Sequence, residues 1–205
     1  MIKGNVNVCA VINRAASVKN GKDGVDYLSF GVKLPINGRN GEVKDLEIAV
    51  TLDSDKAKVK DLAEGKRVKL AGVLALHKSN DDVHFYLRAE SVEKVKATEA
   101  DSIAGAMDFH GKLGKKGYET KIDKNGNSYL SFGAFSCDKP KADKVEFTWV
   151  RFLWFHPADD VSFLQPSGYV EVNGDLQLGV YNGALTIDCL VNEAHQWVLQ
   201  KKEEV

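Results

Sequence analysis

Apolar and polar residues alternate at a spacing of two along much of this chain, which is the period of a half-buried β-strand. The pattern starts at residues 4–13, where every second position is apolar: Val6, Val8, Ala10 and Ile12. Asn-Gly pairs between such segments are typical of hairpin turns. The first part therefore predicts strands at 4–13, 26–34, 43–52, 66–76 and 83–95, with a short helix starting at Ser54 after the third strand.

The chain also repeats itself. The stretch Tyr27–Gly31 (YLSFG) returns unchanged as Tyr129–Gly133, and the offset of 102 positions then continues without a gap, so that Gly72 matches Gly174. A repeat of this length indicates two copies of one structural unit. The strands predicted in the second copy lie at 108–113, 128–136, 144–155, 169–178 and 184–199.

The order of these elements predicts the fold class. Three strands, a short helix or turn, and two more strands is the order of the OB-fold, a five-stranded Greek-key barrel. We therefore expect an all-β chain of two tandem OB-fold barrels, in residues 1–96 and 108–205. Residues 97–107, rich in Ala, Ser and Gly, are expected to be the linker.

The third strand of copy two, VEFTWVRFLWF over residues 145–155, carries the most information about function. Copy one indicates which face is the core, because its matched strand has Leu46, Ile48 and Val50 on one side and charged residues on the other. Side chains of a strand alternate between faces. This register predicts an outward face in copy two that carries Phe147, Trp149, Arg151 and Phe155.

Large rings on the outer face of a barrel strand have two interpretations. An OB-fold binds single-stranded nucleic acid on such a face, with bases stacked on rings and basic groups along the phosphates. An exposed aromatic patch equally marks a surface covered by the other copy or by a second chain. The strand alone leaves both open.

Further motifs point to a family. Residues Phe109–Gly114 read FHGKLG, the third strand contains Trp149-Val150-Arg151 and ends at Phe155, and residues 168–176 read GYVEVNGDL. In this order and spacing the motifs resemble bacterial-type single-stranded DNA-binding proteins, over most of copy two and more faintly over copy one. The resemblance implies that Trp149, Phe155 and Tyr181 stack on bases, and that Arg151 contacts a phosphate or a base edge.

The densest basic segment lies in the first hairpin of copy two. A flexible loop that grips a strand is one interpretation, and a solubilising turn is the other; the first fits the neighbouring aromatic face better. The candidate residues in this segment are Lys112, Lys115, Lys116, Tyr118 and Lys121.

The copies differ where function is expected. Asp45, Glu47 and Asp53 stand at the positions of the aromatic residues of copy two, and carboxylates repel phosphate. We therefore expect copy two to be the main nucleic-acid site. Copy one is expected to be structural or an interaction surface that touches the strand, if at all, through Lys33, Arg39 or Lys44.

The resemblance has limits. The family usually carries a long tail with an acidic tip that recruits repair and replication enzymes, whereas this sequence stops at Lys201–Val205. Two barrels in one chain imply a dimer or a monomer. Trimmed versions encoded by phages or mobile elements are the origin that we expect, with replication or recombination proteins as partners.

Composition narrows the function classes. The 205 residues have a formal net charge of −1, so no global basic field attracts nucleic acid or membranes. Three widely spaced cysteines indicate a reducing cytoplasm rather than a disulfide framework. Phosphate-loop, zinc-protease and Cys-x-x-Cys motifs are absent, so we expect no cofactor, no metal and no enzyme activity.

Single-stranded DNA is the expected ligand, with RNA as a second option. A tandem-barrel protein-interaction module is the alternative function.

Overall fold

The computed structural model describes residues 2–22, 24–38, 40–53, 56–79, 82–141 and 144–198. Its elements are strands with one short 3-10 helix. In chain order they are β1 (Ile2–Asn20), β2 (Asp26–Asn37), β3 (Val43–Leu52), η1 (Lys56–Asp61), β4 (Arg67–Ser79), β5 (Asp82–Lys94), β6 (Ser102–Ile122), β7 (Ser128–Lys141), β8 (Lys144–Trp154), β9 (Tyr169–Tyr181) and β10 (Ala184–Gln196). The all-β prediction is confirmed. Ser54, the expected helix cap, lies outside the described residues.

The strands pair in two closed rings. In the first ring β1 pairs with β2, β2 with β3, β3 with β5, β5 with β4, and β4 again with β1. The second ring repeats this order with β6, β7, β8, β10 and β9. In each ring only the contact between the third and fifth strands is parallel. A closed ring has an inner and an outer side, so alternate residues of every strand face opposite environments.

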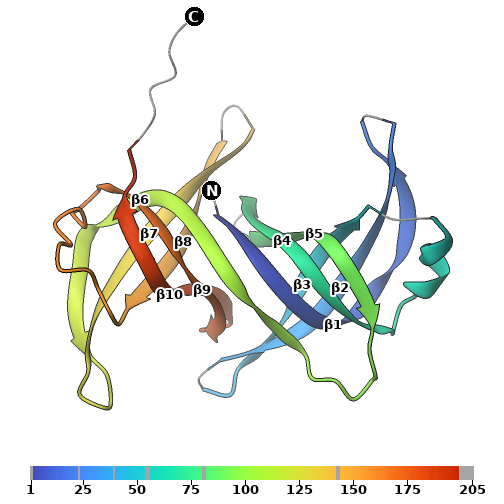
Figure 1. Cartoon of the computed structure of the whole chain (residues 1–205), viewed down its shortest axis with the longest axis horizontal. Helices are drawn as coiled ribbons and strands as arrows, with labels where there is room; N and C mark the ends of the chain where they lie inside the picture. Colours follow the sequence, from blue (N-terminus) through green and yellow to red (C-terminus); the bar gives the residue numbers. More distant parts are fainter. Residues whose placement is uncertain are drawn as a thin grey trace, which may run out of the picture.

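The two rings are joined by a seam between β1 and β6. Residues 2–9 of β1 pair antiparallel with residues 102–109 of β6, from Ile2 opposite Phe109 to Cys9 opposite Ser102. All ten strands therefore belong to one sheet. Figure 1 shows β1 and β6 side by side between the two halves of the molecule.

This seam corrects the predicted linker. Residues 102–107 were expected within it, but they form the first part of β6. The segment is strand because its backbone N–H and C=O groups find partners on β1. Several strands are also longer than predicted, β1 by continuing to Asn20 in its hairpin with β2.

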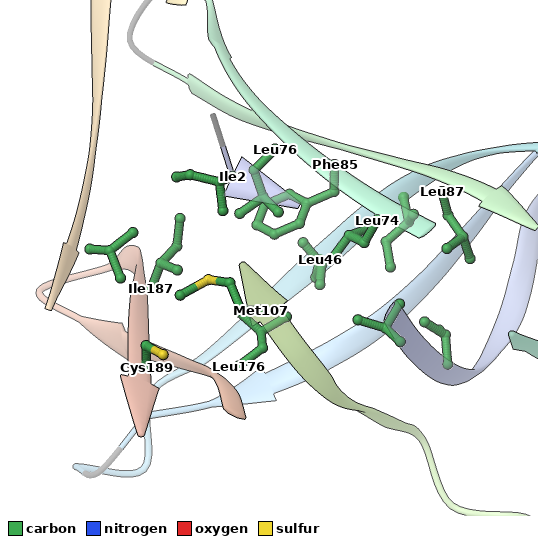
Figure 2. Close-up of a cluster of buried hydrophobic side chains, with 14 of the residues drawn as sticks. Ile2, Leu46, Leu74, Leu76, Phe85, Leu87, Met107, Leu176, Ile187 and Cys189 are labelled. Carbon is green, nitrogen blue, oxygen red and sulfur yellow. The ribbon is translucent and has the colours of Figure 1, made fainter. Parts of the chain in front are cut away.

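The apolar interior crosses the seam. Buried residues of both rings form one contiguous cluster. Figure 2 shows Ile2 and Met107, which come from the two sides of the seam, in the same cluster as Leu74, Leu176 and Cys189. The rings are thus joined by side-chain packing as well as by main-chain hydrogen bonds.

A second contact between the halves lies at a hairpin tip. Lys44 Nζ donates a hydrogen bond to the carbonyl oxygen of Gly183 at 3.0 Å. Gly38 lies so close to β9 that an added Cβ would stand 2.7 Å from the carbonyl oxygen of Val180. The β2–β3 hairpin of the first ring therefore rests against the β9–β10 hairpin of the second (Figure 1).

The seam has a testable steric requirement. A Cβ added at Gly105 would overlap the carbonyl oxygen of Asn5 across the β1–β6 pairing. We expect Gly105→Ala to lower the free energy of unfolding by roughly 1–3 kcal/mol, the usual cost of overpacking. The urea-unfolding midpoint at constant m-value measures this change. Gly133→Ala is the matched control, because its added Cβ would meet no atom closer than 3.8 Å. Equal stability of the two variants would contradict the prediction.

Candidate nucleic-acid interface

Strand β8 presents one set of its aromatic residues to the outside. Phe147 is 43%, Trp149 55% and Phe155, just past the end of the strand, 37% exposed, whereas Phe152 and Trp154 between them are buried. The face predicted from the copy-one register is therefore confirmed. The inward residues fill the second ring, so the outward rings are not needed to complete its core.

Strand β7 supplies two further rings on the same face. Phe135 stands directly opposite Trp149, and the ring centroids are 5.0 Å apart. Phe135 also meets Phe147 edge to face at 5.1 Å, while Tyr129 stacks on Phe155 at 4.8 Å and 23°. These contacts hold the exposed rings in place, since aromatic pairs prefer offset or edge-to-face geometry.

Sequence reasoning did not include Phe135 or Tyr129 among the candidate residues. Phe132 is 3% exposed and stacks on Phe152 in the core. Applied to β7, the same two-residue alternation puts Tyr129 and Phe135 on the side opposite to Phe132. The signal was therefore present in the sequence, and the prediction used it for β8 alone.

Arg151 lies on the outward face as predicted, but it already has a partner. The parallel register of β8 and β10 places Asp188 beside it, and Nε of Arg151 donates to Oδ1 of Asp188 at 3.0 Å. Nη2 donates to the second carboxylate oxygen, which makes the pair bidentate. The Asp188 side chain is only 16% exposed. The charge of Arg151 is thus largely balanced within the protein.

The predicted basic residues of β6 lie at different places around this face. Lys112 stands between Phe135 of β7 and Tyr169 of β9 in the register of the sheet. Lys116 lines the groove described below, and Lys115 is exposed. Lys121 pairs with Glu119 at 3.3 Å, which balances part of its charge.

The path of β6 separates these lysines. Its register with β7 breaks between Leu113 and Tyr118, and Gly117 adopts a φ of 65° there, a conformation that favours glycine. Tyr118, just after the break, is 40% exposed. The lysines therefore do not form the single gripping loop that their sequence spacing suggests.

The outward face of β8 opens into a groove of about 1050 Å³. Phe147, Trp149 and Arg151 line it, and Tyr181 of the β9–β10 hairpin, 64% exposed, lines it from the other side. The first ring contributes its hairpins through residues such as Asn37 and Lys78. The groove thus brings together five predicted residues: Phe147, Trp149, Arg151, Tyr181 and Lys116. Phe155, Lys112, Lys115, Tyr118 and Lys121 are not part of its lining.

The matching face of the first ring has the opposite character. Asp45 pairs with Lys33 at 3.0 Å, and Asp53 pairs with Arg88 at 3.0 Å. The hydrogen bond to Asp45 raises the pKa of Lys33 above its ordinary value, so this lysine stays protonated. Lys44 is engaged with Gly183, and Arg39 lies outside the described residues. Paired charges cover this face of β3, and Tyr86 of β5, 47% exposed, is a ring beside it.

Within residues 2–198, apart from the gaps given above, no group of three or more His, Cys, Asp or Glu side chains could hold a metal ion. Among the same residues no helix is long and apolar enough to cross a membrane.

The chain is similar in structure to several single-stranded DNA-binding proteins. The wild-type protein of Thermus aquaticus shares 12% identity over 98% of this chain and 96% of its own, with a TM-score of 0.47. The mitochondrial protein Rim1 of S. cerevisiae shares 21% identity over 47% of this chain and 96% of its own, with a TM-score of 0.36. The Plasmodium falciparum protein, in a complex with single-stranded DNA, shares 16% over 46% of this chain and 94% of its own, at 0.33. No protein-family model and no curated protein sequence matches the chain.

The three cysteines differ in ways that can be measured. Cys137 is exposed on β7, opposite Phe147, whereas Cys9 and Cys189 are buried. Burial, together with nearby carboxylates such as that of Asp175, raises the pKa of Cys189 to about 12. The thiolate is the reactive form, so Cys189 stays inert at neutral pH.

We expect iodoacetamide at neutral pH to modify Cys137 in the native protein and to reach Cys9 and Cys189 only after unfolding. Mass spectrometry of peptides from native and urea-treated samples measures this. Rapid modification of Cys189 in the native state would show that the interior of the second ring is open.

Proposed function

We propose that this protein binds single-stranded DNA without sequence preference, and that its two rings are OB-fold barrels of which the second carries the main site. The observation that supports this is the row of outward rings, Phe147 and Trp149 on β8, backed by Phe135 on β7. Every base has a π-face, so such a row accepts any sequence.

The geometry suits stacking. Trp149 is more than half exposed, while its contact with Phe135 at 5.0 Å restrains its ring before a ligand arrives. Each stacked base contributes about 1–3 kcal/mol by alanine substitution. A few such rings give useful affinity in a chain whose net charge is only −1.

The basic groups have a secondary role. Lys116 lines the same groove as Trp149 and is available to a phosphate there. Arg151 reaches a phosphate only by sharing its guanidinium with Asp188, because Nε and Nη2 already donate to that carboxylate. The salt dependence of binding is therefore expected to be shallow, since its slope counts the phosphates that are neutralised.

The alternative is a protein-interaction module that uses the same rings against a partner chain. The Arg151–Asp188 pair favours this alternative. An ion pair whose charges balance attracts a polyanion only weakly, whereas it is compatible with contact to a partner protein. Titration with oligothymidine separates the two functions. Quenching of tryptophan fluorescence supports DNA binding, and unchanged fluorescence at low salt supports the module.

Trp149 carries the main prediction. We expect Trp149→Ala to weaken binding of oligothymidine roughly tenfold, because it removes a stacking platform. Fluorescence anisotropy of a labelled oligonucleotide measures the dissociation constant at several salt concentrations. The salt slope should not change, because no charge is lost.

Val145→Ala is the matched control, since Val145 is exposed on the same strand without a ring. Equal affinities of the two variants would remove the support for stacking at β8. RNA of the same length, used as a competitor, determines the preference between the two nucleic acids.

Substitution of Asp188 is expected to strengthen binding of the oligonucleotide, whereas substitution of Trp149 weakens it. We expect Asp188→Asn to tighten binding roughly two- to fivefold at low salt, because the released guanidinium of Arg151 then binds phosphate. The salt slope should steepen by about 0.7, which is the value for one more phosphate contact on a single strand. The same anisotropy titration measures both quantities, and a urea-unfolding curve confirms that the variant is folded. Weaker binding by the folded variant would show that Asp188 orients Arg151 rather than competing for it.

A further inference from the structure

A row of side chains crosses the second ring at right angles to its strands. The register places Trp149 of β8 opposite Phe135 of β7, Phe135 opposite Lys112 of β6, and Lys112 opposite Tyr169 of β9. The backbone N–H of Trp197 donates to the carbonyl oxygen of Tyr169 at 3.1 Å, so Trp197 is the fifth residue of the series. We call these five residues the transverse row.

The far end of the row is a second aromatic cluster. The ring of Tyr169 is 39% exposed and meets Trp197 edge to face at 5.9 Å. Trp197 stacks on His110 at 5.2 Å and 13°. Lys112 joins this cluster to the first one, because its Nζ lies 5.7 Å from the centroid of the Tyr169 ring. Neither Tyr169 nor Trp197 lines the groove beside Trp149.

We propose that the cluster of Tyr169, Trp197 and His110 is a second binding site for the same single strand, which reaches it from Trp149 along the transverse row. This proposal rests on the proposed function. The ligand is a further stretch of unpaired nucleotides. Their bases contact the exposed ring of Tyr169, and the phosphate between the two clusters meets Lys112.

The transverse row offers a cation to a phosphate on this path. Along the transverse row the acidic group near the far cluster is Glu171, 3.6 Å from Nε2 of His110. Lys112 lies on the row itself, so a phosphate meets a cation before it approaches Glu171.

The row also sets a length requirement. Neighbouring strands are about 4.8 Å apart, so the four intervals from Trp149 to Trp197 add up to a path of roughly 19 Å along the backbone around the closed ring. Stacked nucleotides advance about 3.4 Å each, as in one strand of B-form DNA. About six nucleotides therefore separate the two clusters, and a shorter oligonucleotide occupies the groove alone.

A purely structural role for the far cluster makes a different prediction. If these rings only anchor the chain after β10, their removal changes stability and leaves the dependence of affinity on oligonucleotide length unaltered. Length dependence is thus the measurement that separates a binding role from an anchoring role.

The experiment uses the full chain with Tyr169→Ala and a labelled oligothymidine series from about 4 to about 16 nucleotides, the range of site sizes of an OB-fold. We expect the wild-type affinity to rise beyond about six nucleotides. The Tyr169→Ala variant should bind the shortest oligomers like wild type and the longest roughly tenfold more weakly. Tyr86→Ala is the control, because Tyr86 is an exposed tyrosine of the first ring, 47% accessible and away from the row.

Glu171→Gln provides an independent arm. Removal of this carboxylate, whose side chain is 42% exposed, should raise affinity for the long oligomers about twofold and leave the short ones unchanged. An anchoring role alone predicts no such gain.

The outcomes separate the two proposals. Suppose that the wild-type protein binds short oligomers. If Tyr169→Ala then weakens the binding of short and long oligomers equally, or changes the binding of neither, the second site is wrong while the proposed function stands. If wild type binds oligomers of no length, both are wrong. Selective weakening of the long oligomers in a variant with an unchanged unfolding midpoint supports the second site.

Discussion

The closure of each set of five strands by main-chain hydrogen bonds is the constraint on which the rest of this structure depends. Because β6 pairs with both β7 and β9, the second ring has an inside and an outside all the way round. Phe152 and Val150 fill the inside, and the neighbours of each in the chain must then face out. The exposed rings of β8 are therefore a consequence of this alternation, and the core is filled without them.

The two halves use one scaffold for opposite surfaces. In the first ring Asp45 is neutralised by Lys33, and in the second Trp149 is restrained by Phe135. Both arrangements satisfy an outward strand face, one by ion pairing and one by ring packing. The seam between β1 and β6 then makes the halves interdependent, because separation would leave residues 2–9 and 102–109 as unpaired strand edges.

The proposed mode of binding relies on surface shape more than on charge. The arginine at the centre of the face is already paired with Asp188, and Lys121 with Glu119. Rings on β7, β8 and the β9–β10 hairpin remain as the groups that an unpaired base contacts. The proposed mode therefore requires unpaired bases, because bases within a duplex do not offer their faces to a protein ring.

Much of the face could be predicted from sequence because side-chain direction along a strand is a local property. The alternation over residues 145–155, together with the apolar side of the matched strand in copy one, was enough to place Trp149 outside and Trp154 inside. What lies beside each residue is decided by registers between segments far apart in the chain. Asp188 beside Arg151, Tyr169 beside Lys112 and residues 102–107 beside β1 all depend on such pairings. The sequence by itself thus determined which side chains point outward, whereas the tertiary structure decided which of them meet.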